Sequence, residues 1–291
     1  MELCLGTVQF GMEYGIRGVG RPKKEAVYRI LSYAYENGIK SLDTASGYGE
    51  AQRIIGDYLV DSLQSFQIIS KLPFELYKEL QHQDYKEAIK RVVEQTLSDL
   101  RVPKLHGLLF HNPENLYDEY ALESLQELKR MGIVDQIGVS VYDVKDANYA
   151  FEHNLDIIQI PNNLFDRRFD LFLEKVTPSQ QVFARSVYLQ GLLLMDVEEV
   201  KKKLPCAVGA IQKFDALCER YQCSRRECAL AYIKGKKGIH SMIFGVDNLD
   251  QLTENICAYQ RKIENNTLEK IAKEFEKISE TIVSPLNWKR T

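Results

Sequence analysis

Residues 66–71 read Phe-Gln-Ile-Ile-Ser-Lys, and the segment DYKEAIKRVVEQTLSDL follows at residues 84–100. The first is a short apolar run, which is typical of a buried strand. In the second, one stripe of a helix is formed by Ile89, Val92, Val93, Thr96, Leu97 and Leu100. Asp84, with Glu87 three residues later, matches a capping box in form and marks the expected start of this helix. The stretch therefore predicts one strand followed by one amphipathic helix.

The same succession of an apolar run and an amphipathic segment occurs eight times along the 291 residues. The expected strands are residues 3–7, 39–43, 66–71, 107–110, 136–140, 156–160, 181–184 and 241–244. The expected helices are residues 23–37, 51–63, 84–100, 117–131, 144–153, 168–175, 207–221 with 225–234, 248–259 and, last, 267–278. Gly38 follows the first helix in the position of a C-terminal cap. A long polar insertion is expected after the seventh strand.

The expected strands are apolar throughout rather than alternating, as strands buried on both faces are. Eight such strand–helix units predict an α/β fold, a closed (β/α)8 or TIM barrel, for which about 250 residues is the usual length. An open, doubly wound sheet is the alternative built from the same units. No composition shift or linker divides the chain, so we interpret residues 1–291 as a single barrel domain with a C-terminal helix and tail.

The charge balance excludes some classes of partner. Lys and Arg number 38 and Asp and Glu 41, a formal net charge of −3. This near-neutral balance argues against a nucleic-acid partner held by a basic surface. No apolar run approaches the roughly 18 residues that span a bilayer, and the first residues do not resemble a signal peptide. We therefore expect a cytoplasmic protein with no nucleic-acid and no membrane partner. The sequence gives no indication of its oligomeric state.

Six cysteines are present, three of them five residues apart: Cys218, Cys223 and Cys228. The Cys-x-x-Cys spacing typical of zinc sites and redox dithiols does not occur. We expect free thiols and no bound metal.

Polar side chains stand where several of the expected strands end. Asp43 ends the second strand, Lys71 the third, and His111 follows the fourth, while Tyr48 lies five residues after Asp43. Active sites of (β/α)8 barrels lie at the C-terminal ends of the strands, so these four side chains are expected in one space. Each alone has an ordinary interpretation, as a turn cap, a solvated lysine, a turn histidine or one tyrosine among 16. Their joint placement on successive strands favours a catalytic site.

These four residue types suit proton transfer to a carbonyl oxygen. At about 4 Å and an effective dielectric of about 20, a lysine attracts a phenolate by about 4 kcal/mol before desolvation. We therefore expect Lys71 to lower the pKa of Tyr48 towards neutrality and make it a usable general acid. Asp43 would keep Lys71 charged, and His111 could hold the carbonyl oxygen. No cluster with metal-ligand spacing supplies an attacking group, so a cofactor hydride is a good candidate.

The motif around these residues resembles the first signature of the aldo/keto reductase family. It reads Leu-Asp-Thr-Ala-Ser-Gly-Tyr-Gly at residues 42–49, with Gly56 seven residues on. Further matches are Leu5-Gly6-Thr7, Ser70-Lys71, Leu109-Phe110-His111, Gly138-Val139-Ser140, Gln159, Gly245-Val246, Gln251-Leu252, Glu254 and Asn255. They run from about residue 3 to residue 256. The resemblance implies a (β/α)8 reductase that uses a nicotinamide cofactor.

By this resemblance Tyr48 is the proton donor for a small-molecule carbonyl substrate, an aldehyde or ketone. Asp43 and Lys71 tune it, and His111 orients the carbonyl group. The implied cofactor is NADP(H), with NAD(H) possible. Its implied contacts are Gly6, Thr7, Asp43, Ser140, Gln159, Arg185, Ser186, Leu189, Gln190, Gly191, Phe244, Gly245, Val246, Asp247, Gln251, Glu254 and Asn255. The expected substrate contacts are Tyr14, Tyr48, His111, Asn112 and Trp288.

The chain departs from the family pattern at several positions. Val141 replaces the usual asparagine, and Arg185 replaces an aromatic residue that often stacks on the nicotinamide. Gln52 stands for the usual glutamate of the signature. Asp247 occupies a position where a basic residue often meets the 2′-phosphate, and an acidic residue there disfavours NADP(H). The first expected strand begins at residue 3, so we expect no counterpart of the family's usual N-terminal hairpin, which closes the barrel bottom.

Other functions use the same residues. A regulatory protein of this fold could sense the cofactor with little turnover. Lys71 could instead form a Schiff base, as in an aldolase. The side-chain amides of Asn112, Asn162 and Asn163 hint at a polyhydroxylated, sugar-like substrate.

Overall fold

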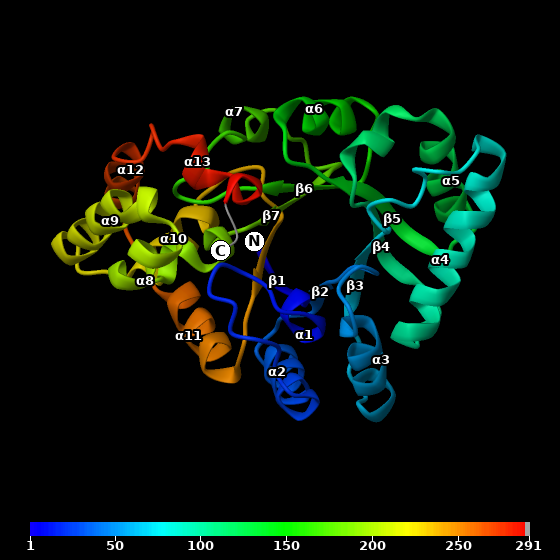
Figure 1. Cartoon of the computed structure of the whole chain (residues 1–291), viewed down its shortest axis with the longest axis horizontal. Coiled ribbons are helices and arrows are strands. Elements are labelled where there is room, and N and C mark those ends of the chain that lie inside the picture. Colours follow the sequence, from blue (N-terminus) through cyan, green and yellow to red (C-terminus); the bar gives the residue numbers. More distant parts are fainter. Residues whose placement is uncertain (289–291) are drawn as a thin grey trace.

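The computed structural model describes residues 1–288 and contains a closed barrel of parallel strands surrounded by helices (Figure 1). The strands follow one another around the barrel in chain order. They are β1 (Glu2–Gly6), β2 (Ser41–Asp43), β3 (Gln67–Lys71), β4 (Leu105–Phe110), β5 (Val134–Ser140), β6 (Ile157–Pro161), β7 (Gln181–Arg185) and β8 (Ser241–Gly245). The predicted (β/α)8 barrel is confirmed, and the open doubly wound sheet is wrong.

The closure of the barrel is visible in the pairing of its first strand. Leu5 of β1 pairs with Leu42 of β2 on one side and with Phe244 of β8 on the other. Strands in a closed sheet have one face towards the barrel axis and the other towards the helices. Accordingly, one apolar cluster consists of Cys4, Ile69, Leu109, Ile157, Phe183 and Ile243 and is separate from the larger core that includes helix residues. This double burial explains why the strand sequences do not alternate.

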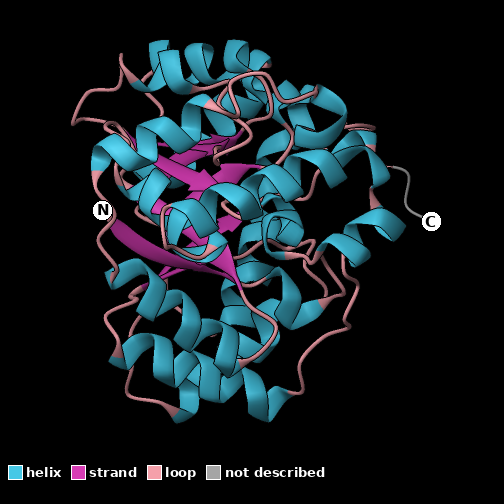
Figure 2. Ribbon diagram, turned by 90° about the vertical axis from the view of Figure 1, so that its left-hand side faces the viewer, coloured by secondary structure: helices cyan, strands magenta, loops and turns pink. Residues whose placement is uncertain are grey.

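Helices cover the outside of the barrel, with the strands enclosed at its centre (Figure 2). The main helices are α2 (Lys24–Glu36), α3 (Ala51–Asp61), α4 (Tyr85–Leu100), α5 (Glu119–Arg130), α6 (Val144–Glu152), α9 (Val208–Arg220), α10 (Arg225–Lys234), α11 (Leu249–Gln260) and α12 (Asn265–Lys273). Shorter ones are α1 (Val8–Gly11), α7 (Asp170–Leu173), α8 (Val197–Lys203) and α13 (Glu280–Val283).

The two helix ends marked by capping residues in the sequence have different outcomes. Gly38 has a φ of +83° just after α2, as its predicted capping position requires. The capping box expected at Asp84 does not form, because residues 82–84 make a 3-10 turn that runs directly into α4. The backbone of Asp84 is therefore already helical, and its side chain makes no cap hydrogen bond. A complete capping box occurs instead at Ser224 and Glu227, at the start of α10.

The segment after β7 is less polar than expected. Residues 189–194 form a 3-10 turn, and Leu189, Leu192, Leu193 and Met195 are buried. The prediction of a polar insertion is wrong for this part. The segment packs its leucines into the core and adds a wall to the barrel mouth.

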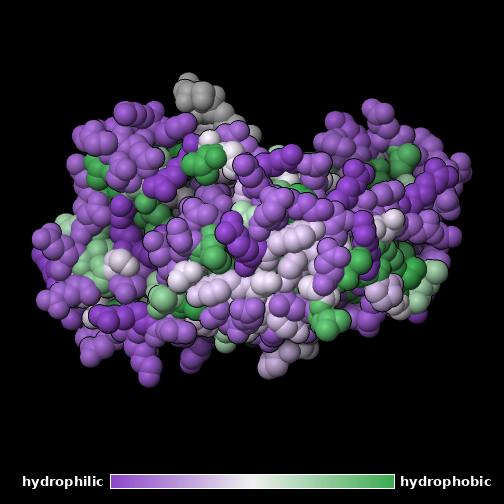
Figure 3. Space-filling model, turned by 90° about the horizontal axis from the view of Figure 1, so that it is seen from below, coloured by the Kyte–Doolittle hydropathy of each residue, from purple (hydrophilic) through white to green (hydrophobic). Residues whose placement is uncertain are grey.

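No helix among residues 1–288 combines the length and the hydrophobicity needed to cross a bilayer. On the face shown in Figure 3, hydrophobic residues are scattered among hydrophilic ones. Single exposed apolar residues of this kind are ordinary on protein surfaces.

Candidate active site

Three successive strands bring the predicted catalytic side chains to the same end of the barrel. Asp43 is the last residue of β2, Lys71 is the last of β3, and His111 directly follows β4. In the loop after β2, Tyr48 donates its backbone N–H to the carbonyl of Ala45, which makes a tight turn. Strand register therefore places these side chains together, although they are far apart in sequence.

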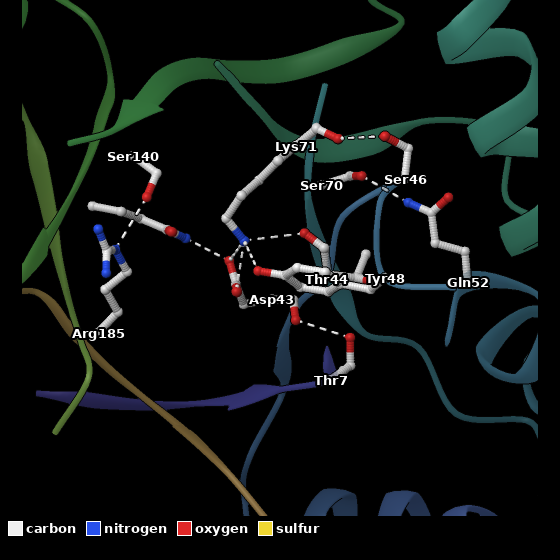
Figure 4. Close-up of polar contacts among 11 residues, drawn as sticks. Thr7, Asp43, Thr44, Ser46, Tyr48, Gln52, Ser70, Lys71, Ser140 and Arg185 are labelled. Carbon is white, nitrogen blue, oxygen red and sulfur yellow. Dashed lines mark hydrogen bonds and ion pairs between the residues drawn. The ribbon is translucent and has the colours of Figure 1, made fainter. Parts of the chain in front are cut away.

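Lys71 lies at the centre of this group (Figure 4). Its Nζ donates to Oδ1 and Oδ2 of Asp43, at 2.7 Å each, and to the Thr44 carbonyl at 3.1 Å. The phenol oxygen of Tyr48 lies 3.5 Å from the same nitrogen. The Lys71 side chain is only 2% exposed, so its charge depends on these partners.

The pKa shifts keep both Lys71 and Tyr48 protonated. Burial alone would lower the pKa of Lys71, but Asp43 reverses the effect and raises the pKa above its usual value. Burial raises the pKa of Tyr48, and the opposing attraction of Lys71 is too weak to offset it. The expectation that Lys71 brings the pKa of Tyr48 towards neutrality is thus wrong for this structure. The Asp43 carboxylate balances the lysine charge, which reduces its effect on the phenol.

His111 completes the group as a neutral imidazole. Its ring lies edge-on to Tyr48, with centroids 6.1 Å apart, and faces Phe74 on another side at 6.0 Å. Burial lowers its pKa to about 3, helped by repulsion from Lys71 and Arg185. A neutral imidazole still offers one N–H donor, which is what holding a carbonyl oxygen requires.

Arg185, at the end of β7, is fixed by contacts with the last residue of β5 and with the loop that follows it. Its Nε donates to the Ser140 hydroxyl at 3.1 Å (Figure 4), and Nη2 donates to the Val141 carbonyl at 2.8 Å. Its guanidinium lies over the ring of Tyr142, 4.4 Å from the centroid. Among residues 1–288 it forms no ion pair within 4.0 Å. Arg185 therefore adds a positive charge to the site that no carboxylate balances directly.

Gln159 lies between the Asp43 end of β2 and the Ser140 end of β5. It is fully buried in β6, pairs in register with Ser140, and donates its side-chain amide to Asp43. Its Oε1 has no hydrogen-bond partner. A buried acceptor without a partner is costly, and it marks a place where a donor from a bound molecule fits.

A cavity of ≈ 490 Å³ opens above these residues, a size typical of small-molecule sites. Most of the predicted site residues line it: Gly6, Thr7, Tyr14, Asp43, Tyr48, Lys71, His111, Ser140, Arg185, Ser186, Gln190, Gly191, Phe244, Gly245, Asp247, Gln251 and Asn255. Leu189 and Val246 are buried next to the lining, as Gln159 is. Glu254 is exposed and pairs with Arg226 instead.

Two predicted substrate residues do not line the cavity. The Asn112 side chain accepts the backbone N–H of Glu114 and caps the turn after β4. Trp288 donates its indole N–H to the Ile282 carbonyl at 3.1 Å and packs the tail against the core. Its neighbour Leu286 contributes to the lining. Of the other amides suggested for a sugar-like substrate, Asn163 binds three backbone groups, whereas the buried Oδ1 of Asn162 has no hydrogen-bond partner.

The structure adds lining residues that the sequence did not indicate. The loop of residues 12–20 crosses beside the cavity, and the Ile16 N–H donates to the Gln190 carbonyl at 3.1 Å. Arg17 donates to the Leu194 carbonyl at 3.2 Å and pairs with Glu199 at 2.9 Å. Other additional lining residues are Val8, Gln9, Tyr142, Tyr188 and Arg226. Val8, Gln9 and Tyr142 adjoin predicted site residues in the chain, whereas Arg17 and Arg226 reach the cavity through packing between distant segments.

The far end of the cavity is rich in charged and amide groups. Gln251 binds Asp247 twice, through the Asp247 backbone N–H at 2.9 Å and its carboxylate at 3.2 Å. Arg226 donates to Asn255 and pairs with Glu254 at 2.7 Å. The carboxylate of Asp247 thus remains a negative charge facing the cavity end, while Glu254 balances Arg226.

Comparison with known proteins agrees with this arrangement. The chain is similar to an uncharacterized oxidoreductase of Bacillus subtilis (YqkF), with 26% identity over 265 residues, covering 84% of this chain and 85% of that protein. It is 23% identical over 265 residues to an NADH-specific methylglyoxal reductase of Escherichia coli, covering 77% and 80%. An aldo-keto reductase structure from Bacillus halodurans superposes with a TM-score of 0.74 at 19% identity, covering 97% and 95%.

The model of the aldo/keto reductase family matches residues 2–274, nearly the whole chain. Together with the closed barrel and the site at its C-terminal mouth, this match shows that the protein belongs to the aldo/keto reductase family and is an oxidoreductase acting on carbonyl substrates.

Proposed function

We propose that this enzyme reduces an aldehyde or ketone with a reduced nicotinamide cofactor, and that Tyr48 donates the proton. The observation that carries the proposal is the contact of buried Lys71 with both Asp43 and Tyr48. This arrangement places a proton donor and a compensating positive charge at one point of the cavity.

In this mechanism Tyr48 stays protonated until a carbonyl oxygen approaches its hydroxyl. His111, as a neutral donor, holds that oxygen in a second hydrogen bond. A bound nicotinamide cofactor supplies the hydride. As the carbonyl oxygen gains negative charge, Tyr48 passes its proton to it, and Lys71 stabilises the phenolate that remains. Asp43 keeps Lys71 charged and directed at the phenol oxygen.

The residues at the strand ends suit the nicotinamide end of such a cofactor. The free acceptor Oε1 of Gln159 lies next to the Ser140 position in the sheet, and together they offer an acceptor and a hydroxyl to a carboxamide. Ser140, Gln159 and Arg185 would hold this end.

For the adenosine end we propose a preference for NADH over NADPH. Family resemblance alone favours NADPH. However, Asp247 would repel a 2′-phosphate, which carries roughly −1.5 to −2 charges near pH 7. Arg226 is balanced by Glu254 and offers little compensation. The name of the Escherichia coli relative, an NADH-specific reductase, agrees with this preference.

The aldolase alternative is disfavoured by the state of Lys71. A Schiff base requires a neutral amine, whereas Asp43 raises the pKa of Lys71 and keeps it charged. The same amine is held by three acceptors and has little freedom to attack a carbonyl carbon.

Titration with NADH and NADPH, followed by a panel of small aldehydes and ketones, tests the proposal. Binding is read from protein fluorescence and turnover from loss of NADH absorbance. We expect binding of both cofactors, with NADH tighter, and turnover of at least one carbonyl compound. Tight binding without turnover across the panel would instead support a cofactor-sensing protein.

A further inference from the structure

Three cysteines meet where α9 ends and α10 begins. After α9, Gln222 adopts a left-handed φ of +51° and donates its N–H to the Glu219 carbonyl at 3.2 Å. The Cys223 N–H donates to the Cys218 carbonyl at 3.0 Å. These two bonds form a Schellman motif, in which the side chains at the Cys218 and Cys223 positions come into contact.

Cys223 holds a second defined position at the start of the next helix. Ser224 is the N-cap of α10, and its capping box with Glu227 is complete. Cys223 therefore precedes the N-cap, and Cys228 is the fourth residue of the helix. Side chains at these two positions pack together in a hydrophobic staple. The five-residue spacing in the sequence thus places Cys223 against both of the other thiols.

The three thiols differ in accessibility and in acidity. Cys218 and Cys228 are buried, whereas Cys223 is half-exposed. Hydrogen bonds from the thiols of Cys218 and Cys228 lower the pKa of Cys223. A solvent-accessible thiolate beside a second thiol is the arrangement that oxidants attack selectively. Within the described part of the chain, no group of His, Cys, Asp or Glu side chains is placed to hold a metal ion.

We propose that Cys223 is a peroxide-sensitive modification site and that Cys218 resolves it to a disulfide. The Cys223 sulfur attacks one oxygen of hydrogen peroxide, the O–O bond breaks, and a sulfenic acid forms with release of water. The Cys218 sulfur then attacks the Cys223 sulfur, expels a second water and closes the S–S bond. Overall, two thiols lose two protons and two electrons, and one peroxide becomes two waters.

The Cys218–Cys223 pair is connected to the cavity through two residues that follow Cys223 in the chain, Arg225 and Arg226. Arg226, three residues after Cys223, lines the cavity and binds Asn255 and Glu254. Arg225 donates to the Leu193 carbonyl at 3.1 Å, in the wall after β7. Closing a disulfide across the turn alters the backbone that positions both guanidinium groups. Oxidation therefore weakens cofactor binding; this consequence rests on the proposed function, whereas the oxidation chemistry does not.

Peptide mapping of the full-length protein tests the oxidation directly. The reduced enzyme is treated with hydrogen peroxide, alkylated and digested with trypsin. Cleavage after Arg220 separates Cys218 and Cys223 into peptides 214–220 and 221–225. We expect these two peptides to be joined by a disulfide that dithiothreitol reverses. Alkylation of both peptides in full, or a linkage of Cys223 to any other cysteine, would overturn the proposal.

Variants separate the reaction at Cys223 from general thiol damage. Cys223→Ser should abolish the linkage, whereas Cys257→Ser, which removes another exposed thiol, should leave it intact. With both neighbouring thiols removed, the double variant Cys218→Ala, Cys228→Ala should leave a sulfenic acid on Cys223 that dimedone traps, and absence of that adduct would contradict the role of Cys223. On oxidation, the Kd for NADH should rise about fivefold or more in the native enzyme and in Cys257→Ser, and should not change in Cys223→Ser. If no NADH binds before oxidation, the proposed function fails while the peptide map still decides the chemistry.

Discussion

Lys71 donates to both carboxylate oxygens of Asp43, and the pair is buried at the top of two adjacent strands. Two opposite charges removed from water tolerate this position only because each satisfies the other. The pair also fixes the lysine nitrogen 3.5 Å from the hydroxyl of Tyr48. The same contact therefore makes two buried charges compatible with the folded barrel and prepares the site for charge on the phenol oxygen.

Removing one partner of this pair should destabilise the protein strongly. Asp43→Ala leaves Lys71 buried without its counter-ion, which costs about 3–5 kcal/mol of unfolding free energy. Urea denaturation monitored by circular dichroism measures the loss. Asp135→Ala removes an exposed ion pair with Lys104 and serves as the control, with little change expected. Equal, small effects of both substitutions would show that the Asp43 pair is not buried as described.

The low pKa of His111 predicts a specific acid sensitivity. Its pKa is about 3 in the folded protein and about 6.5 in the unfolded chain, so below about pH 6.5 only the unfolded chain takes up the proton. The contribution of neutral His111 to the unfolding free energy is fully present above that pH. It is lost as the pH falls, and the loss reaches about 2 kcal/mol at pH 5. Urea denaturation measures the unfolding free energy at pH 7 and at pH 5. Its fall between these pH values should be smaller in His111→Asn than in the native protein by about 2 kcal/mol. Identical losses in both proteins would contradict a buried neutral histidine.

Arg185 should discriminate between the two redox forms of the cofactor. Its guanidinium adds positive charge where we propose the nicotinamide lies, which disfavours the cationic oxidised ring more than the neutral reduced one. Arg185→Gln should therefore strengthen NAD⁺ binding relative to NADH by about tenfold, a modest share of the Coulomb energy of two nearby charges. Arg185→Lys retains the charge and should retain most of the native ratio of Kd values. An unchanged ratio of the Kd values for NAD⁺ and NADH in Arg185→Gln would contradict an electrostatic role of Arg185.

Asp247 should determine the choice between NADH and NADPH. Asp247→Asn removes the charge that repels a 2′-phosphate, so the Kd for NADPH should fall about tenfold while that for NADH changes little. Fluorescence titration of both cofactors measures this. Asp250→Asn removes an exposed charge nearby, in the first turn of α11, and should leave both affinities unchanged. Stronger binding of both cofactors to Asp247→Asn would point to a general effect on the pocket rather than to phosphate repulsion.

The sequence indicated the barrel and much of the site because both depend on short-range signals. Buried strands and helices of regular period produced the eight units, and the last residue of a strand, such as Asp43 or Lys71, has a fixed place in a (β/α)8 barrel. Gln159 was identified through the family resemblance. Its free Oε1 becomes visible only once the packing around it is known.

What the sequence could not indicate depends on contacts between distant segments. Arg17 reaches the cavity because its loop bonds to residues near 190, and Arg226 does so because α10 packs beside α11. The direction of the Tyr48 pKa shift also required the structure, since it reflects the balance between burial and a lysine already neutralised by Asp43. The absence of a capping box at Asp84 could not be predicted either, because the preceding 3-10 turn gives Asp84 a helical backbone conformation.

Replacement of Tyr48 by phenylalanine tests the central claim most directly. Tyr48→Phe removes one hydroxyl and keeps the ring, so NADH should bind with nearly the native Kd in a fluorescence titration. In the same preparation, turnover of a carbonyl compound should fall about 10²–10⁴-fold, the contribution of a positioned general acid. Near-native turnover by Tyr48→Phe, with NADH bound, would contradict the assignment of Tyr48 as the proton donor.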